Sequence, residues 1–186
     1  MTARALFCRQ VRARSKDNDK AIQLLHSQDL LGKVVSTLRE ELDSLVRIIY
    51  LLSIADRQRR TELMQASAEG RKWTVAGSRM VITDRDMVEL AQRLHGWTES
   101  VYRFGCAFIH LSRFHDYRER DPMAQISTEE RLAILGHMRA YHGGPSADDA
   151  TFQDLRPYLP MVFAKIRDNL ECYLKNLEAD GDLASA

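Results

Sequence analysis

The clearest pattern in the chain is a helical spacing of apolar residues that begins after Gly32. Apolar positions separated by alternating steps of three and four residues fall on one face of an α-helix. The residues with this spacing are Val35, Leu38, Leu42, Leu45, Ile49 and Leu52. Additional apolar residues beside this stripe widen it, so we expect a helix that is buried on more than one side. We expect it to continue, with a bend near Asp56, to about Ala68.

A second helical pattern extends from about residue 84 to residue 115. Its apolar positions are Met87, Leu90, Leu94, Trp97, Val101, Phe104, Phe108 and Leu111. Thr83 or Asp84 is suited to cap the start of this helix, because a short polar side chain there accepts a backbone N–H. Gly96 and Gly105 weaken the helix locally, so we expect a kink or a close packing contact at these two positions.

Two more helices are indicated in the last third of the chain. Ser127 and Glu130 have the spacing of a capping box and begin a helix that should end at Gly143. The final apolar pattern extends from Leu155 to Leu177. Pro157 and Pro160 fit the first turn of this last helix or a short turn before it, where a missing N–H costs little.

Residues 72–83 differ from the rest, because two short runs of β-type residues flank a segment that contains Gly77. We expect a small hairpin-like loop there. The overall prediction is an all-α protein, a helical bundle of four to five main helices with this loop between two of them.

The charge distribution suggests how the chain is divided. Residues 1–16 contain five basic residues and no acidic ones, and residues 16–20 are strongly polar. We therefore predict a basic, mobile N-terminal arm over residues 1–31, a single helical domain over residues 32–180 and a short tail over residues 181–186.

Composition narrows the function classes. No apolar run is long enough for a membrane span, and three cysteines without C-x-x-C spacing favour a reducing, cytoplasmic setting. His110 and His115, like His137 and His142, are five residues apart, a spacing that does not place both rings on one helical face. We expect no metal, and no nucleotide-binding motif indicates a cofactor. The net charge is only +1, but local basic clusters allow contact with nucleic acid.

Arg103 and His110 are the most suggestive chemical pair. They are seven residues apart, and seven steps of about 100° return a helix to nearly the same direction. A guanidinium can hold a phosphodiester, and an imidazole can transfer a proton near neutral pH. The alternative is structural: Arg103 pairs with Glu99 one turn earlier, and His110 is an ordinary surface or interface residue.

The chain resembles the HEPN superfamily in one pattern: an Arg and a His separated by six residues on a long helix of an all-α domain of this size. The resemblance rests on Arg103 and His110. It implies a metal-independent endoribonuclease of toxin or defence type, with its site at a homodimer interface. The implied partners are RNA and a protein antitoxin or regulator. The residue after Arg103 is Phe104, where that family more often has a polar residue.

On this interpretation His110 acts as general base or general acid, and Arg103 stabilises the phosphate charge in the transition state. Glu99 and Ser100 would orient Arg103, and Tyr102 and Arg113 would be accessory contacts to RNA. Two alternatives remain open. The chain is a non-catalytic helical interaction or dimerisation module, or it is a nucleic-acid-binding regulator that acts through its basic arm.

Overall fold

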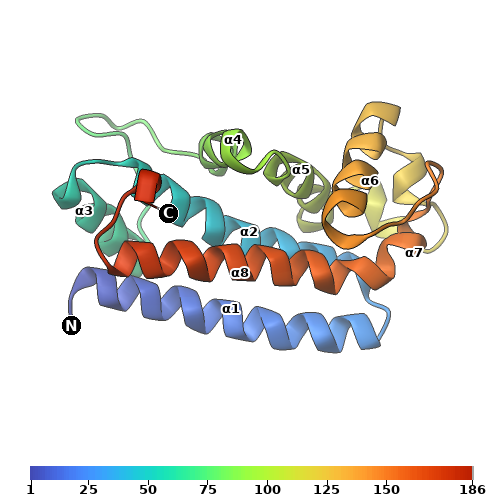
Figure 1. The fold of residues 1–186 in the computed structure, drawn as a ribbon, viewed down its shortest axis with the longest axis horizontal. Coiled ribbons are helices and arrows are strands. Elements are labelled where there is room, and N and C mark those ends of the chain that lie inside the picture. Colours follow the sequence, from blue (N-terminus) through green and yellow to red (C-terminus); the bar gives the residue numbers. More distant parts are fainter. Residues whose placement is uncertain (186) are drawn as a thin grey trace.

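The computed structural model describes residues 1–185 and has an all-α fold, which confirms the predicted class (Figure 1). The α-helices are α1 (Ala3–Ser27), α2 (Leu31–Ser53), α3 (Arg57–Ala68), α4 (Asp84–His95), α5 (Thr98–Ile109), α6 (Thr128–His142), α7 (Phe152–Leu155) and α8 (Leu159–Glu178). Short 3₁₀ turns are η1 (Arg113–Asp116), η2 (Pro122–Ala124), η3 (Arg156–Tyr158) and η4 (Leu183–Ser185). None of the described helices has both the length and the apolar character that crossing a membrane requires.

Helix α2 is the centre of the bundle and packs against α1, α3, α4, α5 and α8. Its apolar residues are buried around nearly the whole helix, including Leu42, Leu45, Ile48 and Ile49. Burial of each such side chain stabilises the fold by about 1.5–3 kcal/mol relative to exposure. The expected helix burial on several sides is therefore confirmed. The bend expected near Asp56 is a break, because the Asp56 carboxylate caps a new helix by accepting the N–H groups of Gln58 and Arg59.

The expectation of a mobile arm over residues 1–31 is wrong. Residues 3–27 form α1, which lies alongside α8 in Figure 1 and also packs against α2 and α3. Phe7, Cys8, Val11 and Ile22 are buried against the bundle. Three of the five basic residues that suggested an arm form ion pairs: Arg4 with Asp180, Arg12 with two glutamates of α8, and Arg14 with Glu40.

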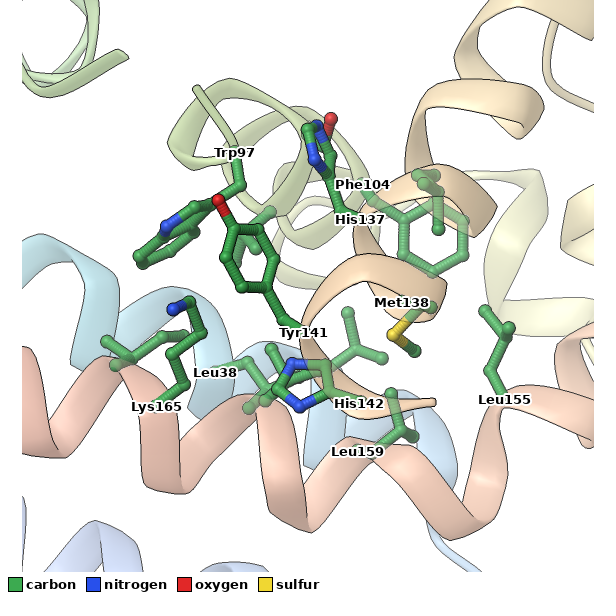
Figure 2. Close-up of a pocket in the computed structure, with 16 residues that line it drawn as sticks. Leu38, Trp97, Phe104, His137, Met138, Tyr141, His142, Leu155, Leu159 and Lys165 are labelled. Atoms are coloured by element: carbon green, nitrogen blue, oxygen red, sulfur yellow. The ribbon is translucent and has the colours of Figure 1, made fainter. Parts of the chain in front are cut away.

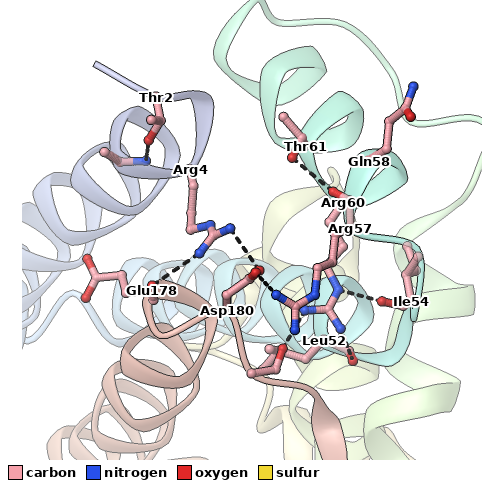
Figure 3. Close-up of polar contacts among 12 residues, drawn as sticks. Thr2, Arg4, Leu52, Ile54, Arg57, Gln58, Arg60, Thr61, Glu178 and Asp180 are labelled. Atoms are coloured by element: carbon pink, nitrogen blue, oxygen red, sulfur yellow. Dashed lines mark hydrogen bonds and ion pairs between the residues drawn. The ribbon is translucent and has the colours of Figure 1, made fainter.

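The tail is fastened to the bundle by arginines (Figure 3). Arg60, only 3% exposed, donates hydrogen bonds to the carbonyl oxygens of Leu52, Ile54 and Gly181. Arg4 and Arg57 form ion pairs with Asp180 at the end of α8. The start of the predicted tail is thus attached through Gly181, and Ala186 lies outside the described residues.

The helix expected over residues 84–115 is two helices. Gly96 has a φ of 72°, the left-handed conformation that glycine adopts readily, and it ends α4. The chain turns at Trp97 and continues as α5. Gly105 makes the close contact that its small size suggested, because a Cβ atom there would lie 2.6 Å from the Cβ of Arg39.

The remaining predicted features follow their local signals. Ser127 caps α6 by accepting the Glu130 N–H, and Gly143 ends this helix with a φ of 80°. Pro157 lies in η3 and Pro160 in the first turn of α8. The loop over residues 72–83 contains one antiparallel bridge between Thr74 and Val81.

Candidate functional site

Arg103 and Glu99 form an ion pair on the surface of α5. The Arg103 Nη2 lies 2.6 Å from Glu99 Oε1, and the Arg103 side chain is 61% exposed. This is the structural alternative expected from their spacing. Exposed pairs of this kind contribute at most about 1 kcal/mol, so Glu99 does not prevent Arg103 from binding an anion.

His110 is the C-cap of α5, the helix that carries Arg103, and its N–H still donates to the Cys106 carbonyl oxygen. Helix α5 ends at Ile109, and His110 has an extended backbone with φ −90° and ψ 144°. Two side chains contact carbonyl oxygens of the last turn: the Ser36 hydroxyl lies 3.1 Å from the Phe108 carbonyl oxygen, and the Ser112 hydroxyl donates to that of Ala107. The prediction that this helix continues to about residue 115 is therefore wrong, whereas the shared direction of the Arg103 and His110 side chains stays a prediction.

The structure does not bring all the residues suggested by the family resemblance together at one site. Arg103 and Arg113 both line a hollow of about 370 Å³ beside the start of α6, and His110 is not among its lining residues. Arg113 donates to the Gln125 carbonyl oxygen at 2.6 Å. The guanidinium carbon of the buried Arg39 lies 4.2 Å from the centre of the Tyr102 ring. Burial raises the pKa of the Tyr102 phenol.

Ser100 lines a different site. This site is an apolar cavity of about 80 Å³ between α2, α5, α6 and α8 (Figure 2). The apolar residues that line it are Val35, Leu38, Trp97, Val101, Phe104, Ile134, Met138, Leu155, Leu159, Val162 and Ile166. The remaining lining residues are Ser100, His137, Tyr141, His142 and Lys165. A mostly apolar lining with a few polar groups is the usual composition of a small-molecule site.

Lys165 is the charged residue of this cavity lining. Its ammonium nitrogen lies 3.9 Å from the centre of the Tyr141 ring and 5.9 Å from that of Trp97. Figure 2 shows the ammonium directed toward these two rings at one side of the cavity. Lys165 lies in the middle of α8, between residues whose apolar side chains line the same cavity, Val162 and Ile166.

Three histidines lie in or near this cavity, and all are biased toward the neutral form. Burial lowers the pKa of His137. Burial and the positive charge of Lys165 lower the pKa values of His142 and His95. His95 lies beside Trp97, and its Nε2 is 3.1 Å from the Tyr173 hydroxyl. Neutral imidazoles next to a lysine supply hydrogen-bonding groups without further positive charge.

The sequence indicated only some of the cavity residues as functional candidates. The sequence suggested a different role for Ser100, and Gly143 indicated only the end of the helix that carries Tyr141 and His142. Lys165 was missed altogether. The signal that could have found it is a lysine within the apolar stripe of the last helix, where a charged residue is unexpected.

Other types of site receive no support from the described residues. Within residues 1–185, no group of three or more His, Cys, Asp or Glu side chains is arranged to hold a metal ion. Comparison with models of protein families, with curated proteins and with solved structures found no match for this chain.

Proposed function

We propose that this protein is a non-catalytic helical binding module that takes up a small apolar group in the cavity between α5, α6 and α8. The observation that carries this proposal is the composition of the cavity wall. Apolar side chains surround the space, and Tyr141, His142 and Lys165 add polar groups that can orient a ligand.

Uptake of an apolar ligand would stabilise the protein. The cavity is open to solvent beside the exposed Tyr141, and covering apolar surface contributes about 25 cal/mol per Å² removed from water. An apolar group that fills the space regains packing contacts that its lining residues lack. Because net stabilities are about 5–15 kcal/mol, this gain is large enough to stabilise the folded protein measurably.

The experiment that tests this proposal is a titration with isocaproamide, a small neutral amide with a branched hydrocarbon body. The Met138 side chain lines the cavity, so its methyl NMR signal should shift as the amide binds. No shift at saturating amide would remove the proposal.

Metal-independent RNA cleavage of the HEPN type is the second candidate, and a specific observation favours it. His110 is exposed, and its two neighbours Ile109 and Leu111 are apolar and exposed, Leu111 to 94%. A second copy of the chain would cover such side chains and bring two His110 residues together. Under this proposal the protein is a cytoplasmic homodimer that acts on RNA, as a toxin or defence protein restrained by a protein antitoxin.

A further inference from the structure

The Lys165 ammonium has aromatic neighbours but no acidic partner. It contacts the rings of Tyr141 and Trp97, and none of the residues lining the cavity is an Asp or Glu. Within residues 1–185 the structure gives Lys165 no ion pair, whereas Arg167, two residues later on α8, pairs with both Asp19 and Asp168. A half-buried cation without a counter-ion favours binding of an anion, since the anion supplies the missing charge.

The other polar groups of the lining limit the charge of that anion. His142 and His137 are biased toward the neutral form by burial, and His142 also by Lys165. They can donate hydrogen bonds, but at neutral pH they add little positive charge. No arginine lines the cavity, so the two-pronged contact that suits a phosphate dianion is absent from the lining. The single positive charge of the Lys165 ammonium therefore balances one singly charged anionic group.

The size of the cavity limits the apolar part of the ligand. An engineered apolar cavity of about 150 Å³ holds a benzene molecule. The cavity here has about half that volume, about 80 Å³, which suits a short branched hydrocarbon group of about four carbon atoms. A longer chain or a fused ring would require side chains such as Met138 to move.

We propose that the ligand of this cavity is a small monocarboxylic acid, with its branched hydrocarbon body among the apolar side chains and its carboxylate on the Lys165 ammonium. This inference rests on the proposed binding function and names the class of ligand. The carboxylate lies at the polar side of the cavity, near Tyr141 and His142, and the hydrocarbon body contacts residues such as Met138 and Leu159.

The test compares two ligands of nearly identical shape, isocaproate and isocaproamide, by isothermal titration calorimetry with the full-length protein at neutral pH. The wild-type protein should bind the acid at least about 10-fold more tightly than the amide, which corresponds to about 1.4 kcal/mol. Lys165→Met should abolish this preference, because the acid should then bind no more tightly than the amide. Lys165→Arg should retain part of it. Lys175→Met, on the exposed side of the same helix, should behave as wild type.

The outcomes separate this inference from the proposal on which it rests. Equal affinity of the wild-type protein for acid and amide would overturn the carboxylate assignment and leave the binding function standing. Failure of both ligands to bind would contradict the binding function itself. A third arm uses an acetylated dipeptide ending in leucine: tighter binding of this peptide than of isocaproate would overturn the small-molecule class in favour of a protein C-terminus. The comparison of acid with amide on the wild-type protein does not depend on whether any variant folds correctly.

Discussion

The ammonium nitrogen of Lys165 lies 3.9 Å from the centre of the Tyr141 ring, so a cation–π contact joins the middle of α8 to the last turn of α6. Both residues line the cavity. The contact therefore couples the position of α6 to the polar side of the proposed binding site. A contact of this type contributes about 0.5–2 kcal/mol, depending on how well it is shielded from water.

A double-mutant cycle with Tyr141→Leu and Lys165→Met measures this coupling. Each single variant should lower the free energy of unfolding, and the double variant should lose about 0.5–1 kcal/mol less than the sum of the two. Urea denaturation of the four proteins gives the values. Strictly additive losses would show that the ring and the ammonium do not stabilise each other.

Filling the cavity should raise stability and prevent binding. Ser100 lines the cavity on α5, and Ser100→Leu places a branched apolar side chain in that space. We expect the free energy of unfolding to rise by about 0.5–2 kcal/mol, with loss of isocaproamide binding measured by calorimetry. Ser53→Leu, at an exposed position at the end of α2, is the matched control and should change neither quantity appreciably. Destabilisation by Ser100→Leu together with retained binding would contradict the assigned cavity.

Arg60 should be among the polar residues most important for stability. Its guanidinium is buried and pairs with three backbone carbonyl oxygens, of Leu52, Ile54 and Gly181. Arg60→Met leaves these oxygens without their donor and should lower the free energy of unfolding by about 2–4 kcal/mol. Arg57→Met removes a mostly exposed guanidinium from the same helix and should lower it by less than about 1 kcal/mol. Equal losses in urea denaturation would argue against the anchoring role of Arg60.

Glu41 should make stability depend on pH. Its carboxyl group is buried in α2, where it accepts hydrogen bonds from Ser15 and Asn18, and burial raises its pKa above the ordinary value of 4.5. The folded state therefore prefers the protonated acid. Its stabilising contribution is complete below the ordinary pKa and is lost as the pH rises through the folded-state pKa.

Glu41→Gln removes this dependence while keeping the shape of the side chain. Relative to wild type, the variant should become progressively more stable as the pH is raised above 4.5 toward the folded-state pKa of Glu41. Urea denaturation at several pH values measures the difference. If the difference between the two proteins stays constant over this range, the folded-state pKa of Glu41 is not raised.

The nuclease candidate has its own test. If the protein cleaves RNA, His110→Ala should abolish cleavage in the presence of a chelator. Because the His110 side chain is exposed, the thermal melting temperature should stay nearly unchanged. Absence of cleavage by the wild-type protein, or full activity of the variant, would remove this candidate and leave the binding function unaffected.

Local signals in the sequence predicted much of the fold. The apolar spacing predicted α2, and short-range chemistry predicted the cap at Ser127 and the helix end at Gly143; at Gly96 it predicted a kink, where the structure has a helix end. These features depend on residues close in the chain, whose conformational preferences act before any tertiary contact forms. The prediction failed for α1 because its many charged residues conceal a sparse apolar face that includes Phe7 and Ile22.

The site was harder to predict because it depends on contacts between distant residues. The apolar spacing of α5 continues through Leu111, but the Ser36 hydroxyl bonds to the Phe108 carbonyl oxygen and the helix ends at Ile109. His110 is therefore the last residue attached to the helix of Arg103 by a helical hydrogen bond. Lys165 meets Tyr141 only when α6 folds against α8, an arrangement that no local pattern specifies.

The most direct test of the central claim follows the methyl signals of two buried methionines during a titration with isocaproamide. Met138 lines the cavity, and Met64 is buried in α3 and does not line it. The account predicts a saturable shift of the Met138 signal with little change in the Met64 signal. An unchanged Met138 signal, or equal shifts of both signals, would contradict specific binding in the cavity between α5, α6 and α8.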